Sequence, residues 1–306
     1  MPDAEIHPVV VVGEGLVVFV PESDGPLADA AVFRRSLAGA ELNVAVALSR
    51  ADVPAAVISR VGDDGFGQFA TAELRRHGVG TEAIQVDPEA PTGLYVKELV
   101  TDPGGAISRM HYYRSSSAGS RLSPATLQQP AAAALLQAAR VVHTTGVTSA
   151  LSATCLDAQR ALFADVLPER LRSFSAHWRS ALWRGREDEG RRVLAELARS
   201  ADVLFVDVDD AAEIFGIRDA AELRLAVPEP RMLVITRSDG ATAFDGAERG
   251  EAPSIDFTLV EPTGAADAFA AGFLAGFVSG LSLAGSLARA NRLATRVMSS
   301  TRDHLG

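Results

Sequence analysis

Cysteine is nearly absent from this chain: Cys155 is the single one among 306 residues, so no internal disulfide can form. Without a disulfide framework the sequence fits a reducing compartment. Cys155 lies in LSATCLDAQRAL, which has the pattern of a helix start. We expect a buried, inert thiol there rather than a nucleophile.

Positive charge and long apolar runs are also lacking. The formal net charge is −10 and the sequence pI is about 5.1, which argues against a nucleic-acid-binding surface. A small anionic substrate is not excluded, because a few arginines can neutralise it locally. No apolar run approaches the ~20 residues of a membrane span. The first residues carry acids before the apolar run and no basic start, unlike a signal peptide. We therefore predict a cytoplasmic protein with no membrane contact.

Two further signatures are missing. In VVGEGLVVF, Gly13 and Gly15 are followed by Val18 where the third glycine of a dinucleotide-binding turn belongs. A nicotinamide-dependent dehydrogenase is therefore disfavoured. The histidines show no metal-ligand spacing, so a zinc site is not expected.

The apolar pattern predicts a wound α/β fold. Residues 9–12 read as a buried parallel strand and residues 41–50 as an amphipathic helix, and strand–helix alternation continues beyond them. Residues 92–114 break this rhythm with two strands joined by a turn-rich connector. We predict one domain over residues 1–306, with a central, mainly parallel sheet between helices. Residues 15–37 and 92–114 should form a small β-sheet lid.

The stretch EPTGAADAFAAGF places Asp267 where a loop becomes an apolar helix. One interpretation is a helix cap, which contributes about 1 kcal/mol. The other is a catalytic base beside an anion site, because the free amides of a helix N-terminus bind anions. The residues of this stretch leave both interpretations open.

The stretch EPTGAADAF resembles the C-terminal signature of the ribokinase-like (PfkB) carbohydrate kinases. AGAELNVAVALSRADVPAAVISRVGDDGFGQF resembles their N-terminal signature, and the likeness covers nearly the whole chain. The resemblance implies a ribokinase-like fold with Asp267 as general base. It assigns the anion hole for the transferred phosphoryl group to Gly264, Ala265 and Ala266.

Within that family the sequence is most similar to 2-keto-3-deoxygluconate kinases. The resemblance implies substrate contacts by six residues: Gly39, Asn43, Tyr95, Tyr112, Arg114 and Arg179. The chemistry agrees, because a guanidinium can bind a carboxylate through two parallel hydrogen bonds. Arg114 and Arg179 could close on one carboxylate from different segments. The sequence pattern alone favours a simpler interpretation, in which each arginine forms a surface ion pair and each tyrosine packs in the core or on a sheet face.

Several positions depart from the family pattern. Ala38 replaces the first of two glycines, and Ala266 replaces a glycine of the anion hole, where an alanine works only if its φ is negative. Ser175 and His177 stand where the family has aspartate and asparagine; His177 either bonds a substrate hydroxyl or packs at a strand end. The family motif that helps arrange magnesium corresponds to Asp207–Asp210 in this chain. Asp210 stands where the family has a glutamate, and its shorter side chain could replace that glutamate through a water molecule.

The implied activity is ATP-dependent phosphorylation of a primary hydroxyl of a sugar acid, with 2-keto-3-deoxygluconate as the first choice. The cofactors implied are ATP and Mg²⁺, with K⁺ as a further candidate, and the nucleotide-side residues are Thr236, Asp210 and Asn291. Two alternatives stay open: a kinase for a neutral sugar or nucleoside such as fructose or ribose, and a catalytically impaired binding protein of the same fold. The open edges of a lid sheet favour a homodimer or higher homo-oligomer.

Overall fold

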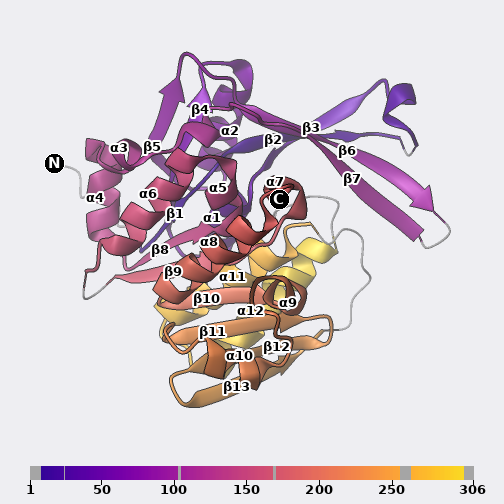
Figure 1. Cartoon of the computed structure of the whole chain (residues 1–306). Coiled ribbons are helices and arrows are strands. Elements are labelled where there is room, and N and C mark those ends of the chain that lie inside the picture. The colour runs from indigo at the N-terminus through magenta and orange to yellow at the C-terminus, as the bar shows by residue number, and fades with distance from the viewer. Residues whose placement is uncertain (1–7, 24, 103–104, 168–169, 256–262, 300–306) are drawn as a thin grey trace.

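A nine-stranded sheet forms the centre of the protein (Figure 1). The computed structural model describes residues 8–23, 25–102, 105–167, 170–255 and 263–299. The strand order is β13-β12-β11-β10-β9-β8-β1-β4-β5, and only β12 and β13 run antiparallel to their neighbours. The strands are β1 (Val9–Val12), β4 (Ala55–Gly62), β5 (Gly80–Asp87), β8 (Val141–Thr145), β9 (Leu171–Ser175), β10 (Val203–Asp207), β11 (Met232–Arg237), β12 (Gly240–Asp245) and β13 (Glu248–Pro253). The predicted wound parallel sheet is confirmed.

The central strand β1 shows why the sequence chooses this arrangement. All four of its valines are buried, because helices cover both faces of the sheet. Val9 and Val11 belong to one hydrophobic core, and Val10 and Val12 belong to the other. Successive side chains of a strand point to opposite faces, so one short valine run supplies both cores.

The helices form a layer on each face of this sheet (Figure 1). One core is shared with α1 (Ala40–Arg50), α2 (Gly65–Arg76), α11 (Ala265–Val278) and α12 (Leu283–Met298). The other is shared with α3 (Pro124–Leu127), α4 (Pro130–Ala138), α5 (Gly146–Leu151), α6 (Ala153–Ala164), α7 (Ser180–Trp183), α8 (Glu187–Ser200), α9 (Val208–Phe215) and α10 (Ala220–Ala226). Cys155 in α6 is fully buried, and burial raises the pKa of its thiol to about 12, as expected of an inert side chain.

A second sheet extends from this body like an arm (Figure 1). Its order is β3-β2-β6-β7, with β2 (Leu16–Pro21), β3 (Phe33–Ala38), β6 (Gly93–Asp102) and β7 (Gly105–Tyr113). β6 and β7 form the predicted antiparallel hairpin, and β2 and β3 join it from the predicted first segment. The two lid segments therefore share one sheet, while the lid function itself stays a prediction.

Two strands, β5 and β13, were not predicted. β13 is the edge strand ERGEAP, whose side chains are all partly or fully exposed. An edge strand that buries no side chain has no apolar alternation, so the pattern that reveals inner strands is absent from it.

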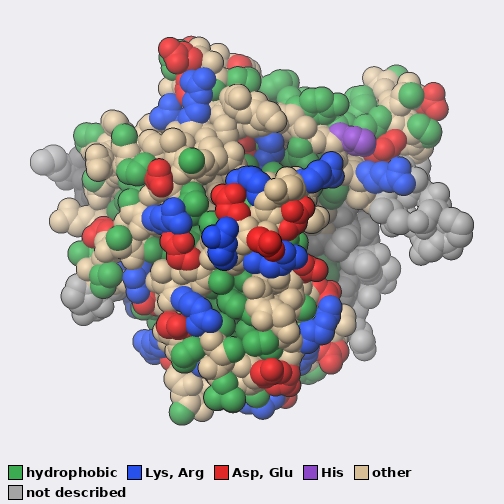
Figure 2. Space-filling model, in the orientation of Figure 1, with side chains coloured by type: hydrophobic (Ala, Val, Ile, Leu, Met, Phe, Trp, Pro, Cys, Tyr) green, Lys and Arg blue, Asp and Glu red, His purple; other side chains and the backbone are tan. Residues whose placement is uncertain are grey.

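Charged side chains of both signs mix on the face shown in Figure 2. Arg191 of α8, for example, pairs with Asp188 and with Glu213 of α9. Within the described ranges, none of the helices combines the length and the apolar character needed to cross a bilayer.

The packing of α11 against α12 generates a testable prediction. A methyl group on Gly272 would lie 2.7 Å from the Cα of Ala290, so Gly272→Ala should destabilise the fold by about 1–3 kcal/mol through overpacking. The control is Gly65→Ala in α2, where nothing lies within 4 Å of the added methyl. That change should alter stability by no more than about 1 kcal/mol, and in the favourable direction. Urea unfolding of the three proteins measures this, and equal effects would contradict close helix contact.

Candidate active site

The helix α11 begins in the turn that the sequence singled out. Gly264 is its N-cap with φ +82°, a left-handed conformation that favours glycine. Ala265, Ala266 and Asp267 form the first turn, whose amides have no partner within the helix. Ala266 is helical and is not among the described residues with positive φ, so its amide stays available as a donor. Glu261 and Pro262 of the motif lie outside the described residues.

Asp267 does not cap this helix. The N-cap is Gly264, and no side-chain bond caps α11. The carboxylate instead turns toward α1, where Oδ2 accepts a 2.9 Å hydrogen bond from Nδ2 of Asn43. Asp267 is 6% exposed and Asn43 5%, so this contact is shielded from water. Oδ1 of Asn43 is buried without a hydrogen-bond partner, so it can accept one from a ligand hydroxyl.

Beside this carboxylate opens a cavity of about 550 Å³. Its wall includes Ala265 and Ala266 of α11 and the carboxyl ends of β9, β10 and β11, the edge where ligands bind in open α/β sheets. The wall also includes Arg179. All three residues predicted to lie on the nucleotide side belong to it as well, namely Asp210, Thr236 and Asn291. The cavity is large enough for a small-molecule ligand.

Carboxylates gather on one side of the cavity. Asp207 ends β10 and accepts a 3.2 Å hydrogen bond from the Thr236 hydroxyl. Burial raises the pKa of Asp210 to about 6, and the nearby Arg179 guanidinium partly opposes that rise. Carboxylate oxygens are the ligands that Mg²⁺ prefers, so Asp207 and Asp210 fit a magnesium–nucleotide complex.

A second cluster lies at the base of the small sheet. Arg114 follows β7, has a side chain only 9% exposed, and forms an ion pair from Nε to Oε2 of Glu14 at 3.3 Å. Its Nη2 is buried and has no hydrogen-bond partner. Tyr95 and Tyr112 are cross-strand neighbours with ring centroids 5.1 Å apart, and the Arg114 guanidinium lies 5.1 Å from the Tyr112 ring. A buried, partly satisfied guanidinium beside two phenols suits a small polar ligand that carries a negative charge.

Sequence reasoning missed Glu14. It follows the buried strand β1 in Gly13-Glu14-Gly15, and burial raises the pKa of its carboxyl while Arg114 and Ser117 lower it. Added methyl groups on Gly93 and Gly119 would lie 3.0 Å or less from Glu14, so small residues make room for it. An acid at the carboxyl end of a buried central strand was the signal that could have revealed it.

Glu41 is a second buried acid that the sequence analysis did not assign. It lies in the first turn of α1, and its Oε1 accepts hydrogen bonds from the Thr145 hydroxyl at 2.8 Å and the Thr148 hydroxyl at 2.7 Å. These bonds tie the start of α1 to the start of α5. They hold in place the helix that carries Asn43.

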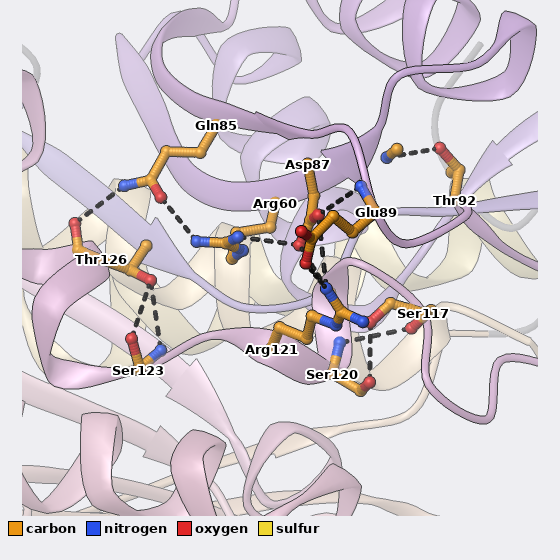
Figure 3. A network of polar contacts seen from close by, with 12 residues as sticks. Arg60, Gln85, Asp87, Glu89, Thr92, Ser117, Ser120, Arg121, Ser123 and Thr126 are labelled. Atoms are coloured by element: carbon orange, nitrogen blue, oxygen red, sulfur yellow. Dashed lines mark hydrogen bonds and ion pairs between the residues drawn. The ribbon is translucent and has the colours of Figure 1, made fainter.

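Figure 3 shows a polar network that includes Arg60, Asp87, Arg121 and Ser117. Arg60 of β4 binds Asp87 of β5 at 2.8 Å, and Arg121 approaches Asp87 from the next loop at 3.5 Å. That loop also contains Ser117, whose hydroxyl donates a 2.7 Å hydrogen bond to Oε1 of Glu14. The network thereby fixes the loop that carries both Ser117 and Arg114.

Gly39 has a conformational role that explains one departure in the sequence. Its φ is +123°, and an added methyl would lie 2.6 Å from the backbone oxygen of Glu14. Ala38 ends strand β3 and is not among the described residues with positive φ. An alanine is therefore tolerated at 38, whereas residue 39 needs glycine.

The predicted site residues fall into two groups that meet at Asp267. Arg179, Asp210, Thr236 and Asn291 share the cavity wall, with Ala265 and Ala266. Arg114 lies outside that wall with Glu14, so the two arginines predicted to close on one anion are found in different surroundings. Asp267 contacts Asn43 on one side and approaches His177, which lines the cavity, on the other.

Comparison with known proteins agrees with this geometry. The model of the pfkB family of carbohydrate kinases matches residues 7–303. The chain is 34% identical to a 2-dehydro-3-deoxygluconokinase of Thermoproteus tenax, over 86% of this chain and 79% of that protein. It is 32% identical to fructokinase-1 of Oryza sativa subsp. japonica, over 85% and 80%.

A solved sugar kinase from Pyrococcus horikoshii, described as uncharacterized and in complex with ATP, has the same fold. Its TM-score is 0.82 at 25% identity, covering 96% of this chain and 93% of that one. The family match spans nearly the whole chain, and the helix N-terminus, carboxylate and cavity lie together as an ATP-dependent sugar kinase requires. The chain belongs to the pfkB family of carbohydrate kinases.

Proposed function

We propose that this kinase phosphorylates the primary hydroxyl of a sugar acid, with 2-keto-3-deoxygluconate (2-dehydro-3-deoxygluconate) as the first candidate. The observation that carries the proposal is Arg114, a buried guanidinium whose Nη2 has no hydrogen-bond partner and which stands beside Tyr95 and Tyr112. Burying such a group costs free energy unless it finds a partner, and a substrate carboxylate supplies one. The 34% identity to a 2-dehydro-3-deoxygluconokinase supports the same choice.

In the proposed reaction Asp267 takes the proton of the primary hydroxyl. The hydroxyl oxygen then forms a bond to the γ-phosphorus of ATP, while the bond from that phosphorus to the β–γ bridging oxygen breaks and ADP departs. The amides of Gly264, Ala265 and Ala266 stabilise the negative charge on the transferred group. Asn43 holds the carboxylate of Asp267 toward the acceptor hydroxyl. Most of the rate enhancement comes from this positioning and charge stabilisation.

Mg²⁺, when bound, would neutralise the phosphate charge. Asp207 and Asp210 would hold it directly or through water, and Thr236 and Asn291 would line the nucleotide. Arg179 stays a predicted ligand of the substrate carboxylate. Its place in the cavity wall near Asp210 equally suits an anionic group at the border between nucleotide and sugar. K⁺ stays a candidate without a residue assigned to it, and closure of the small sheet over the sugar remains part of the proposal.

A neutral sugar such as fructose is the second candidate. The observation in its favour is that Glu14 already forms an ion pair with Arg114, which reduces the net positive charge available to a substrate. A panel of sugars and sugar acids, assayed by ADP release with saturating ATP and Mg²⁺, distinguishes the two. Tight binding of a ligand without ADP release would instead favour a binding protein of this fold.

Asp267→Asn tests the base. The substitution keeps the size of the side chain and an oxygen that can accept from Asn43, but it removes the proton acceptor. We expect kcat to fall by about 10²–10⁴-fold with KM for ATP nearly unchanged. A coupled assay of ADP formation measures both constants. Turnover at the wild-type rate would remove Asp267 from the role of base.

Arg114→Ala tests the substrate class. Loss of a hydrogen-bonded ion pair should lower kcat/KM for a sugar acid by about 10–100-fold and for a neutral sugar only a few-fold. Because the change would leave Glu14 buried without its cation, the double variant with Glu14→Gln is measured in parallel. The control is Arg34→Ala, an arginine of β3 whose side chain is 77% exposed. Equal losses for acid and neutral substrates would exclude carboxylate recognition by Arg114.

Asp210→Asn tests the nucleotide side through stability as well as activity. The folded carboxyl keeps its proton up to about pH 6, whereas the reference value is 3.8. Between pH 3.8 and about pH 6 the folded state therefore binds more protons than the unfolded state. The free energy of unfolding falls as the pH rises through this range, and the loss persists above pH 6. Without Mg²⁺ or nucleotide, the variant should be more stable by up to about 3 kcal/mol at pH 8 and equal to wild type below pH 4.

The same Asp210→Asn variant should require more Mg²⁺ for half-maximal activity. Asp188→Asn is the matched control, since the Asp188 side chain is 95% exposed and is not among the residues that line the cavity. Urea unfolding at the two pH values and Mg²⁺ titration of turnover give the two readouts. A variant less stable than wild type at pH 8 would contradict a buried, destabilising carboxylate at position 210.

A further inference from the structure

His177 lies at the point where the two halves of the site meet. It comes two residues after β9, and its imidazole lines the cavity on the nucleotide side. It is 6% exposed. Its backbone packs closely against the start of α5, where an added methyl on Gly146 would lie 3.0 Å from the His177 backbone oxygen. The ring is therefore held at a fixed place beside Asp267.

The imidazole presents an unsatisfied nitrogen to the carboxylate. Nδ1 of His177 is buried without a hydrogen-bond partner, and it lies 3.9 Å from Oδ1 of Asp267. On the other side, Nδ2 of Asn43 lies 2.9 Å from Oδ2. Two side-chain nitrogens, one from the segment after β9 and one from α1, thus face the two oxygens of one carboxylate.

Burial, with a smaller contribution from neighbouring groups, keeps this ring neutral. Burial lowers the pKa of His177 well below its usual value, and the neighbouring Arg179 and His143 lower it further. A neutral imidazole has one N–H, and placing it on Nδ1 directs the donor at Asp267. A distance of 3.9 Å is too long for a hydrogen bond, and a movement of about 1 Å closes it. Catalytic hydrogen bonds often shorten to bonding distance when substrate binds.

We infer that His177 is a positioning residue that acts through Asp267. In its neutral form it donates from Nδ1 to Oδ1 of Asp267 and, together with Asn43 at Oδ2, fixes the plane of the carboxylate. The orientation of a base relative to the reacting hydroxyl strongly affects the rate. The inference rests on the proposed role of Asp267 as the base.

Two substitutions of His177 test which ring nitrogen has the proposed role. The amide nitrogen of an asparagine is as many bonds from Cα as Nδ1, whereas that of a glutamine matches Nε2. His177→Asn should keep kcat within about 3-fold of wild type, while His177→Gln and His177→Leu should lose about 10–100-fold in kcat, with both KM values nearly unchanged. In the latter two, the acid limb of the kcat/KM profile should move to higher pH, because the carboxylate loses a donor.

A combination with Asp267→Asn shows whether His177 acts through the carboxylate. In that background His177→Gln should cause little further loss, since interacting residues are not additive. Additive losses would overturn the inference in favour of simple packing. The same conclusion would follow if His177→Asn were as impaired as His177→Gln and the acid limb of the kcat/KM profile did not shift. Asp267→Asn alone tests the base, so failure of the base role is recognised separately.

A measurement on the unaltered protein does not depend on the folding of any variant. Long-range ¹H–¹⁵N spectra of the histidine rings identify the tautomer of His177, with His177→Asn used to assign its signals. We expect a neutral ring protonated on Nδ1 across the pH range of activity. A ring protonated on Nε2 would overturn the inference, because Nδ1 could then only accept.

Discussion

The hydrogen bond between Asn43 and Asp267 is the contact on which the rest of the site depends. It joins residues 224 positions apart, from the first turns of α1 and α11, which pack into the same hydrophobic core. Each of these helices starts at a glycine with positive φ, Gly39 and Gly264. The strands beneath fix where each helix can begin, and the glycines allow the sharp turns. The site is therefore a consequence of where two helices start above one sheet edge.

Holding these charges away from water is the main energetic cost of the arrangement. Asp267, Glu14 and Glu41 are buried and the Arg114 side chain is only 9% exposed, and burying an ion costs several kcal/mol unless it is paired and hydrogen-bonded. The structure offsets this cost locally: threonine hydroxyls bind Glu41, and Ser117 and Arg114 bind or pair with Glu14. Several buried polar atoms of the described residues have no hydrogen-bond partner, and Nη2 of Arg114, Oδ1 of Asn43 and Nδ1 of His177 are among them. Each such buried atom in a native structure calls for an explanation, and a bound ligand would supply one for these three.

Sequence reasoning predicted the fold for a physical reason, while the site assignment stays a prediction. The buried strands, the hairpin of the small sheet and the helix at Asp267 are all local patterns, and local patterns are what periodicity records. The edge strand β13 buries no side chain and so gave no signal. The pair formed by Glu14 and Arg114 joins positions 100 residues apart, and the sheet β3-β2-β6-β7 must be assembled before they meet. The separate surroundings of Arg114 and Arg179 were unpredictable for the same reason.

In the proposed site, charge balance would decide between acid and neutral sugars. Arg114 and Glu14 together carry little net charge when both are ionised, so a neutral ligand can enter without disturbing the pair. A carboxylate ligand adds a second anion to the same guanidinium, and in a buried site that arrangement is tolerated only if one acid is neutralised or fully hydrogen-bonded. Burial already raises the pKa of Glu14, which makes proton uptake by this carboxyl less costly than for an exposed acid. A sugar acid would therefore take its place beside Arg114 as the competitor of Glu14, and selection between acid and neutral substrates would follow from that competition.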